Sequence, residues 1–64
     1  DVIKKVIYKS INVLKLNGIL AIEIGHGQYK AVRNLLIANN FKEKFVIKDF
    51  ENNIRCIFST LLKK

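Results

Sequence analysis

Residues 17–25 read NGILAIEIG, an apolar run bracketed by glycines with one carboxylate, Glu23, near its end. A solvent-facing strand alternates apolar and polar side chains, whereas Ile19 to Ile22 is apolar at every position, which is typical of a parallel strand covered on both faces. Such a strand requires helices above and below it, and helical patterns precede and follow the run. We therefore predict a buried central strand here.

The segment from Val2 to Leu14 has the pattern of an amphipathic helix. Its apolar residues recur at spacings of three and four, with lysines between them. Asn17 and Gly18 tolerate the left-handed backbone conformation in which helices commonly end. We expect the helix to end before them and the strand to begin at Ile19.

A second amphipathic helix is expected after the strand, from Gln28 to Ala38, with Asn39-Asn40 as its stop signal. Phe41 would fold back onto the end of this helix as a hydrophobic contact. The residues predicted to face inward are Ala31, Val32, Leu35 and Leu36.

Two further strands are predicted, Phe45–Phe50 and Arg55–Leu62, separated by the polar turn 51–53. A connection this short requires the two strands to be antiparallel neighbours. The succession of helices and strands is typical of an α/β layer fold, in which ligands bind where parallel strands end. Glu23 and Gly25 would emerge at that edge of the sheet.

The chain has 64 residues, half of them apolar, and contains no methionine. A domain of this size buries only about 60% of its unfolded surface. A strand apolar on both faces in so short a chain predicts a segment, residues 1–64, of a longer α/β protein. Cys56 has no second cysteine to pair with, and no signal peptide pattern or membrane-spanning run is present, so we predict a cytoplasmic location.

The formal net charge is +7, which raises the possibility of a nucleic-acid partner. The lysines are spread along both helices and across the turns and strands, without a cluster. We interpret them as solvated surface residues, so direct contact with nucleic acid is not expected.

The turn Gly25-His26-Gly27 is the other candidate for chemistry. Glycines let a ligand approach the backbone, but this turn lacks the third glycine of a dinucleotide-binding loop. His26 has no second histidine to complete a metal site, so we interpret it as an exposed turn residue. Cys56 is interpreted as a small apolar residue of the last strand.

Several motifs resemble one enzyme family. Residues 14–20 (LKLNGIL) resemble the L-K-P-G-G-x-L that precedes the fifth strand of many Rossmann-like methyltransferases. Residues 23–33 are similar to E-I-G-x-x-Q-x-x-A-V-R, and residues 49–57 to D-[LFY]-x-x-x-x-R-x-[VI]. Leu16-Asn17 stands where the family has Pro-Gly, and Asn40 stands before Phe41 where it has Gly. The chain to about Leu62 thus resembles the C-terminal end of the HemK (PrmC) glutamine methyltransferases.

The resemblance implies an activity and a fold. These enzymes use S-adenosylmethionine to methylate the glutamine side chain in the Gly-Gly-Gln motif of peptide chain release factors. Their class I methyltransferase sheet has the strand order 3-2-1-4-5-7-6, so this chain would supply strands five, six and seven, with strand seven antiparallel and between the other two. That topology would bring Glu23, Asp49 and Arg55 to the same edge, where we expect a structural charge cluster.

The family's glycine-rich cofactor loop and its Asn-Pro-Pro-Tyr motif match no residues of this chain. We therefore assign no catalytic, cofactor-binding or metal-binding residue, and we expect the 64-residue chain alone to be inactive. Three alternatives stay open. The parent enzyme could methylate a ribosomal-protein glutamine instead. The chain could be a small RNA-binding module that uses exposed aromatics, although Phe45, Phe50 and Phe58 are interpreted as core residues. It could also form a homodimer through an open edge of Ile19–Ile24.

Overall fold

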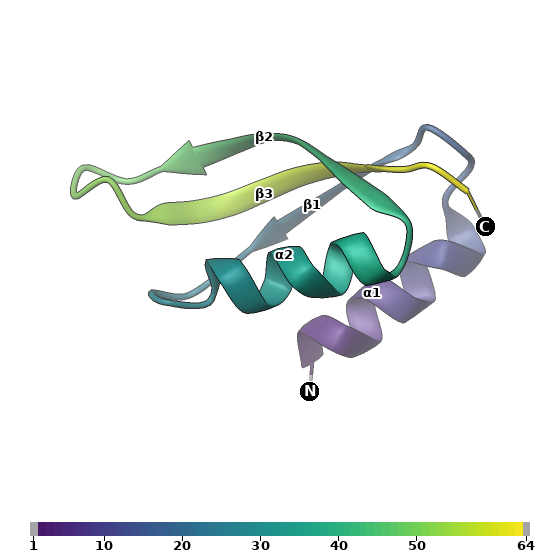
Figure 1. Cartoon of the computed structure of the whole chain (residues 1–64), viewed down its shortest axis with the longest axis horizontal. Helices are drawn as coiled ribbons and strands as arrows, with labels where there is room; N and C mark the ends of the chain where they lie inside the picture. The colour runs from purple at the N-terminus through teal and green to yellow at the C-terminus, as the bar shows by residue number, and fades with distance from the viewer. Residues whose placement is uncertain (1, 64) are drawn as a thin grey trace.

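The chain forms two helices and a three-stranded sheet (Figure 1). The structure is a computed structural model and describes residues 2–63. The elements are α1 (Val2–Val13), β1 (Ile19–Glu23), α2 (Tyr29–Ala38), β2 (Phe41–Lys48) and β3 (Ile54–Leu61).

The strand order is β1-β3-β2, and β3 runs antiparallel to both of its neighbours. The predictions that the last strand lies between the other two and that β2 and β3 are antiparallel neighbours are confirmed. Within residues 2–63, β1 pairs with β3 alone. Both β1 and β2 run antiparallel to β3. Their carboxyl ends therefore lie at the same end of the sheet as the beginning of β3.

The core lies between the helices and one face of the sheet, here called the inner face. Ile7 of α1 and Val32 and Leu36 of α2 pack against side chains that alternate along the strands. The buried strand and loop residues of this core are Ile22, Ile24, Phe41, Ile57 and Leu61. Ile57 is fully buried at the centre of β3, opposite Ile22 on β1 and Val46 on β2.

The prediction that β1 is covered on both faces is wrong for this chain. Both helices pack against the inner face and lie below the sheet in Figure 1. The opposite, outer face carries Ile19, Ala21, Glu23, Lys42, Phe45, Ile47, Cys56, Phe58 and Thr60. Ile19 is 58% exposed, Phe45 53% and Ile47 51%, so much of this face is apolar and open to solvent.

The bounds predicted for the strand that forms β2, Phe45–Phe50, are also wrong. The strand begins at Phe41 and ends at Lys48, because Asn40 adopts a left-handed φ of 68° that ends the helix and turns the chain directly into the sheet. Phe41 is 2% exposed and belongs to the core. A register shift between Glu43 and Phe45 then moves Phe45 to the outer face.

Smaller corrections concern the other elements. Ala31, predicted to face inward, is exposed, whereas Val32 and Leu36 are buried as expected. The last strand, β3, spans Ile54–Leu61 rather than Arg55–Leu62. The predicted left-handed turn before β1 is confirmed at Asn17, whose φ is 67°.

Two buried serines provide a matched test of hydrogen bonding in the core. Among the described residues, Ser59 Oγ is buried without a hydrogen-bond partner, whereas Ser10 Oγ donates to the Ile7 carbonyl oxygen at 2.7 Å. An unpaired buried hydroxyl is unfavourable, so we expect Ser59→Ala to leave the stability unchanged or raise it by up to about 1 kcal/mol. Ser10→Ala is expected to lower it by about 0.5–1 kcal/mol. Urea unfolding of both variants checks this, and a larger loss for Ser59→Ala would contradict it.

Candidate functional site

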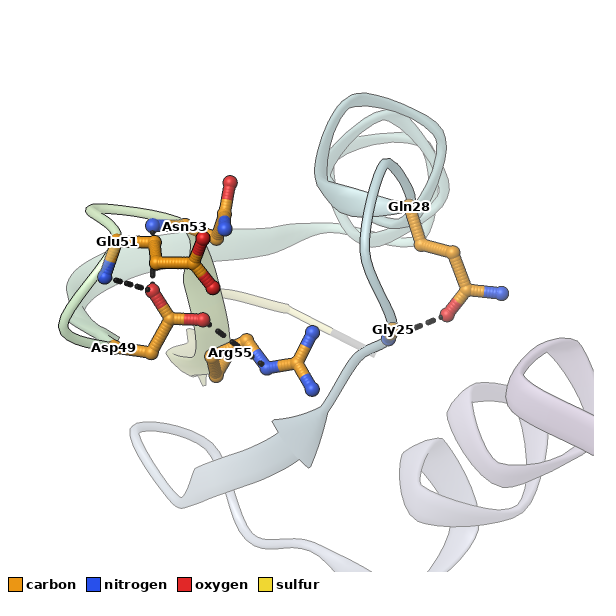
Figure 2. Close-up of polar contacts among 6 residues, drawn as sticks. All are labelled: Gly25, Gln28, Asp49, Glu51, Asn53 and Arg55. Atoms are coloured by element: carbon orange, nitrogen blue, oxygen red, sulfur yellow. Dashed lines mark hydrogen bonds and ion pairs between the residues drawn. The ribbon is translucent and has the colours of Figure 1, made fainter.

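The candidate site lies at the edge of the sheet where β1 and β2 end and β3 begins. The loop after β1 and the hairpin turn 49–53 meet there on either side of Arg55 (Figure 2). The Ile24 N–H donates to the Arg55 carbonyl oxygen at 2.9 Å, which continues the pairing of β1 with β3 into the loop. Main-chain hydrogen bonds therefore fix this end of the sheet.

Asp49 organises the hairpin turn. Its Oδ1 accepts hydrogen bonds from the main-chain N–H groups of Glu51 and Asn53, both at 2.9 Å. Its Oδ2 lies 3.8 Å from Arg55 Nε in an ion pair. Asn52 completes the turn with a left-handed φ of 67°. These contacts are those of an Asp that caps a turn through its side chain.

The pKa of Asp49 lies below its usual value. The largest cause is the hydrogen bond from the Asn53 main chain, followed among the lowering causes by the Glu51 main-chain bond and the charge of Arg55, while partial burial acts in the opposite direction. These contacts, together with a side-chain hydrogen bond from Asn53, stabilise the carboxylate over the protonated acid. The turn thus holds Asp49 ionised.

This depressed pKa predicts an acid sensitivity. Because the folded-state pKa is below the ordinary value of 3.8, the stabilisation by Asp49 is complete above that value and is lost as the pH falls through the folded-state pKa. Stability measured by urea unfolding should therefore fall over that acid range. Asp49→Asn should be less stable at neutral pH and should show a flatter acid response. An identical pH profile for the variant would contradict this role.

Glu23 does not join the Asp49–Arg55 pair. Its side chain is exposed on the outer face, because Glu23 lies opposite Cys56, whereas Arg55 lies opposite the buried Ile24. No ion pair of Glu23 is found within residues 2–63. The structure thus brings together two of the three residues of the expected cluster. Since the Arg55 and Asp49 side chains are 47% and 32% exposed, their pair contributes little beyond shaping the turn.

A second polar contact closes the loop between β1 and α2. The Gly25 N–H donates to Gln28 Oε1 at 2.8 Å, and the Gln28 N–H donates to the Gly25 carbonyl oxygen at 3.2 Å (Figure 2). This reciprocal pair explains why Gly and Gln stand three residues apart. The sequence analysis does not predict this role of Gln28, although the Gly-x-x-Gln spacing is part of the motif at residues 23–33. His26 is exposed in the turn, as expected.

Tyr29 and Glu43 form a further contact that sequence reasoning missed. The Tyr29 hydroxyl donates to Glu43 Oε1 at 2.7 Å, which joins the start of α2 to β2. The hydrogen bond to Glu43 is the largest cause that raises the pKa of Tyr29. The residues lie 14 positions apart, and no local pattern links them.

We expect Tyr29→Phe to lower the free energy of unfolding by about 1 kcal/mol, because it removes a hydrogen bond to a charged group at a partly buried position. Urea unfolding at neutral pH measures the change. Tyr8→Phe is the control, since Tyr8 lies on the exposed side of α1. Equal effects of the two substitutions would show that the Tyr29 hydroxyl bond contributes nothing.

The described residues enclose no pocket, and no group of three or more His, Cys, Asp or Glu residues among them could hold a metal ion. No helix in the described part of the chain is long and apolar enough to cross a membrane. The contacts of Asp49, Arg55 and Gln28 form turns and extend the strand pairing at this end of the sheet. Comparisons with protein-family models, curated proteins and solved structures find no match.

Proposed function

We propose that this chain is the C-terminal part of an S-adenosylmethionine-dependent methyltransferase. The proposed reaction is methylation of the glutamine side chain in the Gly-Gly-Gln motif of peptide chain release factors, in the cytoplasm. The chain would contribute one end of the sheet, while the preceding part of the enzyme would supply the cofactor loop and the residues that hold the target amide.

The strand arrangement carries this proposal. The resemblance implies that strand seven lies antiparallel between strands five and six, and the observed order is β1-β3-β2 with β3 reversed. A hairpin whose second strand lies between the two earlier strands is not dictated by composition or by helix and strand propensity. The agreement therefore supports a kinship that was suggested by motifs alone.

The two asparagines that stand where the family motifs have glycine also support the proposal. Asn17 and Asn40 replace glycines of the motifs, and their φ angles are 67° and 68°. Glycine adopts this left-handed conformation most readily, and asparagine is the non-glycine residue that tolerates it best. At both asparagines the backbone thus has a conformation that glycine adopts readily.

The uncovered outer face is consistent with a segment of a larger enzyme. Ile19, Phe45 and Ile47 would find cover if helices from the preceding part of the protein packed on this face. The motif residues Asp49 and Arg55 form an ion pair at the hairpin, and Gln28 closes its loop, so these positions have structural roles that do not require the cofactor.

The test uses the complete parent polypeptide. It is expected to contain the glycine-rich loop and the Asn-Pro-Pro-Tyr motif, and to transfer a methyl group to the Gly-Gly-Gln glutamine of a release factor, detected by mass spectrometry of the tryptic peptide. A release factor with asparagine in place of that glutamine is the matched control. Methylation of a ribosomal-protein glutamine instead would establish the sister activity, and a parent that lacks both motifs would overturn the proposal.

The 64-residue chain alone gives a second measurement. Calorimetric titration with S-adenosylmethionine is expected to show no binding, because no cofactor motif lies within residues 1–64. A clear binding signal would contradict the assignment of this chain to the cofactor-free end of the enzyme.

One observation supports a second candidate, an RNA-binding module. The interpretation of Phe45 and Phe50 as core residues is wrong, because Phe45 is 53% exposed and Phe50 is fully exposed in the hairpin turn. The rings of Phe45 and Phe58 stack on the outer face with centroids 4.5 Å apart and planes 13° apart. Exposed aromatics on a sheet are platforms for bases. Titration with single-stranded RNA at several salt concentrations tests this, and Phe45→Ala should abolish any specific binding.

A further inference from the structure

The strand β2 forms one edge of the sheet, and α2 packs against it (Figure 1). The hydrogen bond from the Tyr29 hydroxyl to Glu43 holds the start of α2 beside this strand. The two elements carry exposed cations, here called the basic edge: Lys30, Arg33, Lys42 and Lys44. The fold thus brings together basic residues that are spread along the sequence.

The contacts of Tyr29 place the cations of α2. The hydrogen bond to Glu43 raises the pKa of Tyr29 most, and the charge of Arg33 partly opposes this rise, so Arg33 lies beside the same contact. Lys30 lies three residues before Arg33, on the same side of the helix. Both cations are therefore on the flank of α2 that adjoins β2.

The positive charge of the basic edge is not balanced by acidic residues. Glu43 is the only acidic residue of α2 and β2, and it accepts the hydrogen bond from Tyr29. Within the described residues, no ion pair is formed by Lys30, Lys42 or Lys44. Unbalanced cations gathered at one edge attract polyanions and raise their rate of association.

The basic edge lies on the side of the sheet away from β1. In the strand order that the family resemblance implies, strand six ends the sheet, and β2 would be that strand. The earlier strands of such an enzyme would be added beyond β1, on the far side of β3. The basic edge would therefore remain an outer edge of the sheet in the longer protein as well.

Two features favour a nucleic acid over an acidic protein as the polyanion. Lysine is depleted in protein–protein interfaces, whereas contacts with a phosphate backbone require only exposed cations. Phe45 follows Lys44 directly, is 53% exposed and stacks on Phe58, so an aromatic surface adjoins the cations. Cations beside exposed aromatic rings are typical of proteins that bind single-stranded nucleic acid.

Protection of the sheet edge is the alternative role of the lysines. Lysines on an edge strand prevent it from pairing with another chain. This role would account for Lys42 and Lys44, but it requires no cation on α2. Lys30 therefore separates the two roles, because it lies outside the sheet.

We propose that the basic edge binds the phosphate backbone of single-stranded RNA. Lys42 and Lys44 contact phosphates from the strand and Lys30 from the helix, without reading the base sequence. The proposal goes beyond the methyltransferase assignment and does not rest on it. It also differs from the RNA-binding module considered above, because the affinity here comes from the cations rather than from Phe45 and Phe58.

The probe is a labelled oligouridine of about ten nucleotides, titrated with the 64-residue chain and followed by fluorescence anisotropy. We expect binding that weakens as the salt concentration rises, because each contacted phosphate releases counterions. For a single strand, the slope of log affinity against log salt concentration is about 0.7 per contacted phosphate. Absence of binding at low salt, or binding that salt does not weaken, would overturn the proposal.

Lysine substitutions locate the contacts. Lys42→Gln combined with Lys44→Gln should lower the slope by about 1.4, and Lys30→Gln by about 0.7. The matched control, Lys9→Gln combined with Lys15→Gln, removes the same charge from α1 and from the turn before β1. An equal fall of the slope in the control would show that the net charge of +7, rather than the basic edge, binds the RNA, and would overturn the proposal.

The alternative partners give distinct outcomes. Oligoglutamate of the same net charge is expected to bind more weakly than oligouridine, because it has no bases to stack on Phe45. Equal or tighter binding of oligoglutamate would replace RNA with an acidic protein partner and overturn the proposal. RNA binding that Phe45→Ala abolishes and the lysine variants leave unchanged would also overturn it. Methylation by the parent enzyme is measured separately, so the two proposals fail independently.

Discussion

Ile57→Ala is expected to leave the chain largely unfolded at room temperature. Ile57 is fully buried in the central strand, opposite Ile22 and Val46, and therefore contributes to both strand pairs and to the contact with the helices. Truncation of a buried isoleucine to alanine costs about 2–5 kcal/mol. A single core in a chain of this size rarely supplies more than about 3–5 kcal/mol of stability. The substitution should remove most or all of that stability.

Circular dichroism and urea unfolding measure this effect, and Ile47→Ala is the matched control. Ile47 lies on β2, next to the central strand, but faces outward and is 51% exposed. Its truncation should change the stability by less than about 1 kcal/mol. Equal losses for the two substitutions would mean that the inner face is not the core of this fold.

Gly18→Ala is expected to lower the stability by about 1–3 kcal/mol. A Cβ at this position would lie 2.8 Å from the Lys15 carbonyl oxygen, which is main chain and cannot move independently. The Gly18 N–H donates to that same oxygen at 2.9 Å, and the Gly18 carbonyl accepts from Leu61 at 3.2 Å. The added methyl group would therefore disturb both the end of α1 and the first pairing of β1 with β3.

The shift of the urea midpoint checks this expectation. Gly25→Ala is the control, because a Cβ there would meet only the end of the flexible Gln28 side chain at 3.2 Å, where a shift of a few tenths of an ångström relieves the contact and keeps the hydrogen bond from the Gly25 N–H. The control should change the stability by less than half as much as Gly18→Ala. A larger loss at Gly25 would show that the 25–28 loop, rather than the turn before β1, limits stability.

The helix periodicity, and the strand order implied by the family resemblance, agree with the structure better than the predicted burial does. The run Ile19–Ile22 is apolar at every position, and this pattern was interpreted as cover on two faces. Within residues 2–63 only one layer of helices is present, so alternate residues of the run remain exposed. Periodicity indicates which faces a strand can bury, but it does not state how many layers the chain itself supplies.

The bulge in β2 explains why the prediction of Phe45 as a core residue is wrong. In the segment FKEKFVIK, Phe41, Glu43, Phe45 and Ile47 alternate without interruption, as if all belonged to one face. The register shift between Glu43 and Phe45 places Phe41 on the inner face and Phe45 on the outer face. A one-residue shift reverses every following side chain, and no sequence signal at this position marked it.

The candidate site was predicted in part for a related reason. Strand direction correctly placed Glu23, Asp49 and Arg55 at one edge of the sheet, since the topology fixes where each strand begins and ends. The pleat then separated them, because Glu23 and Arg55 point to opposite faces. The contacts of Gln28 and Tyr29 were not predicted. The Gln28 contact depends on how the loop closes, and the Tyr29 contact depends on β2, which is distant in the sequence.

The central position of β3 also governs how the chain folds. Within residues 2–63, β1 and β2 do not pair with one another, and each pairs with residues 54–61. The β2–β3 pair is a local hairpin, whereas β1 meets β3 only after α2 and β2 have intervened in the chain. The pairing of β1 with β3 therefore closes a long loop, which makes this step slower than the formation of the hairpin.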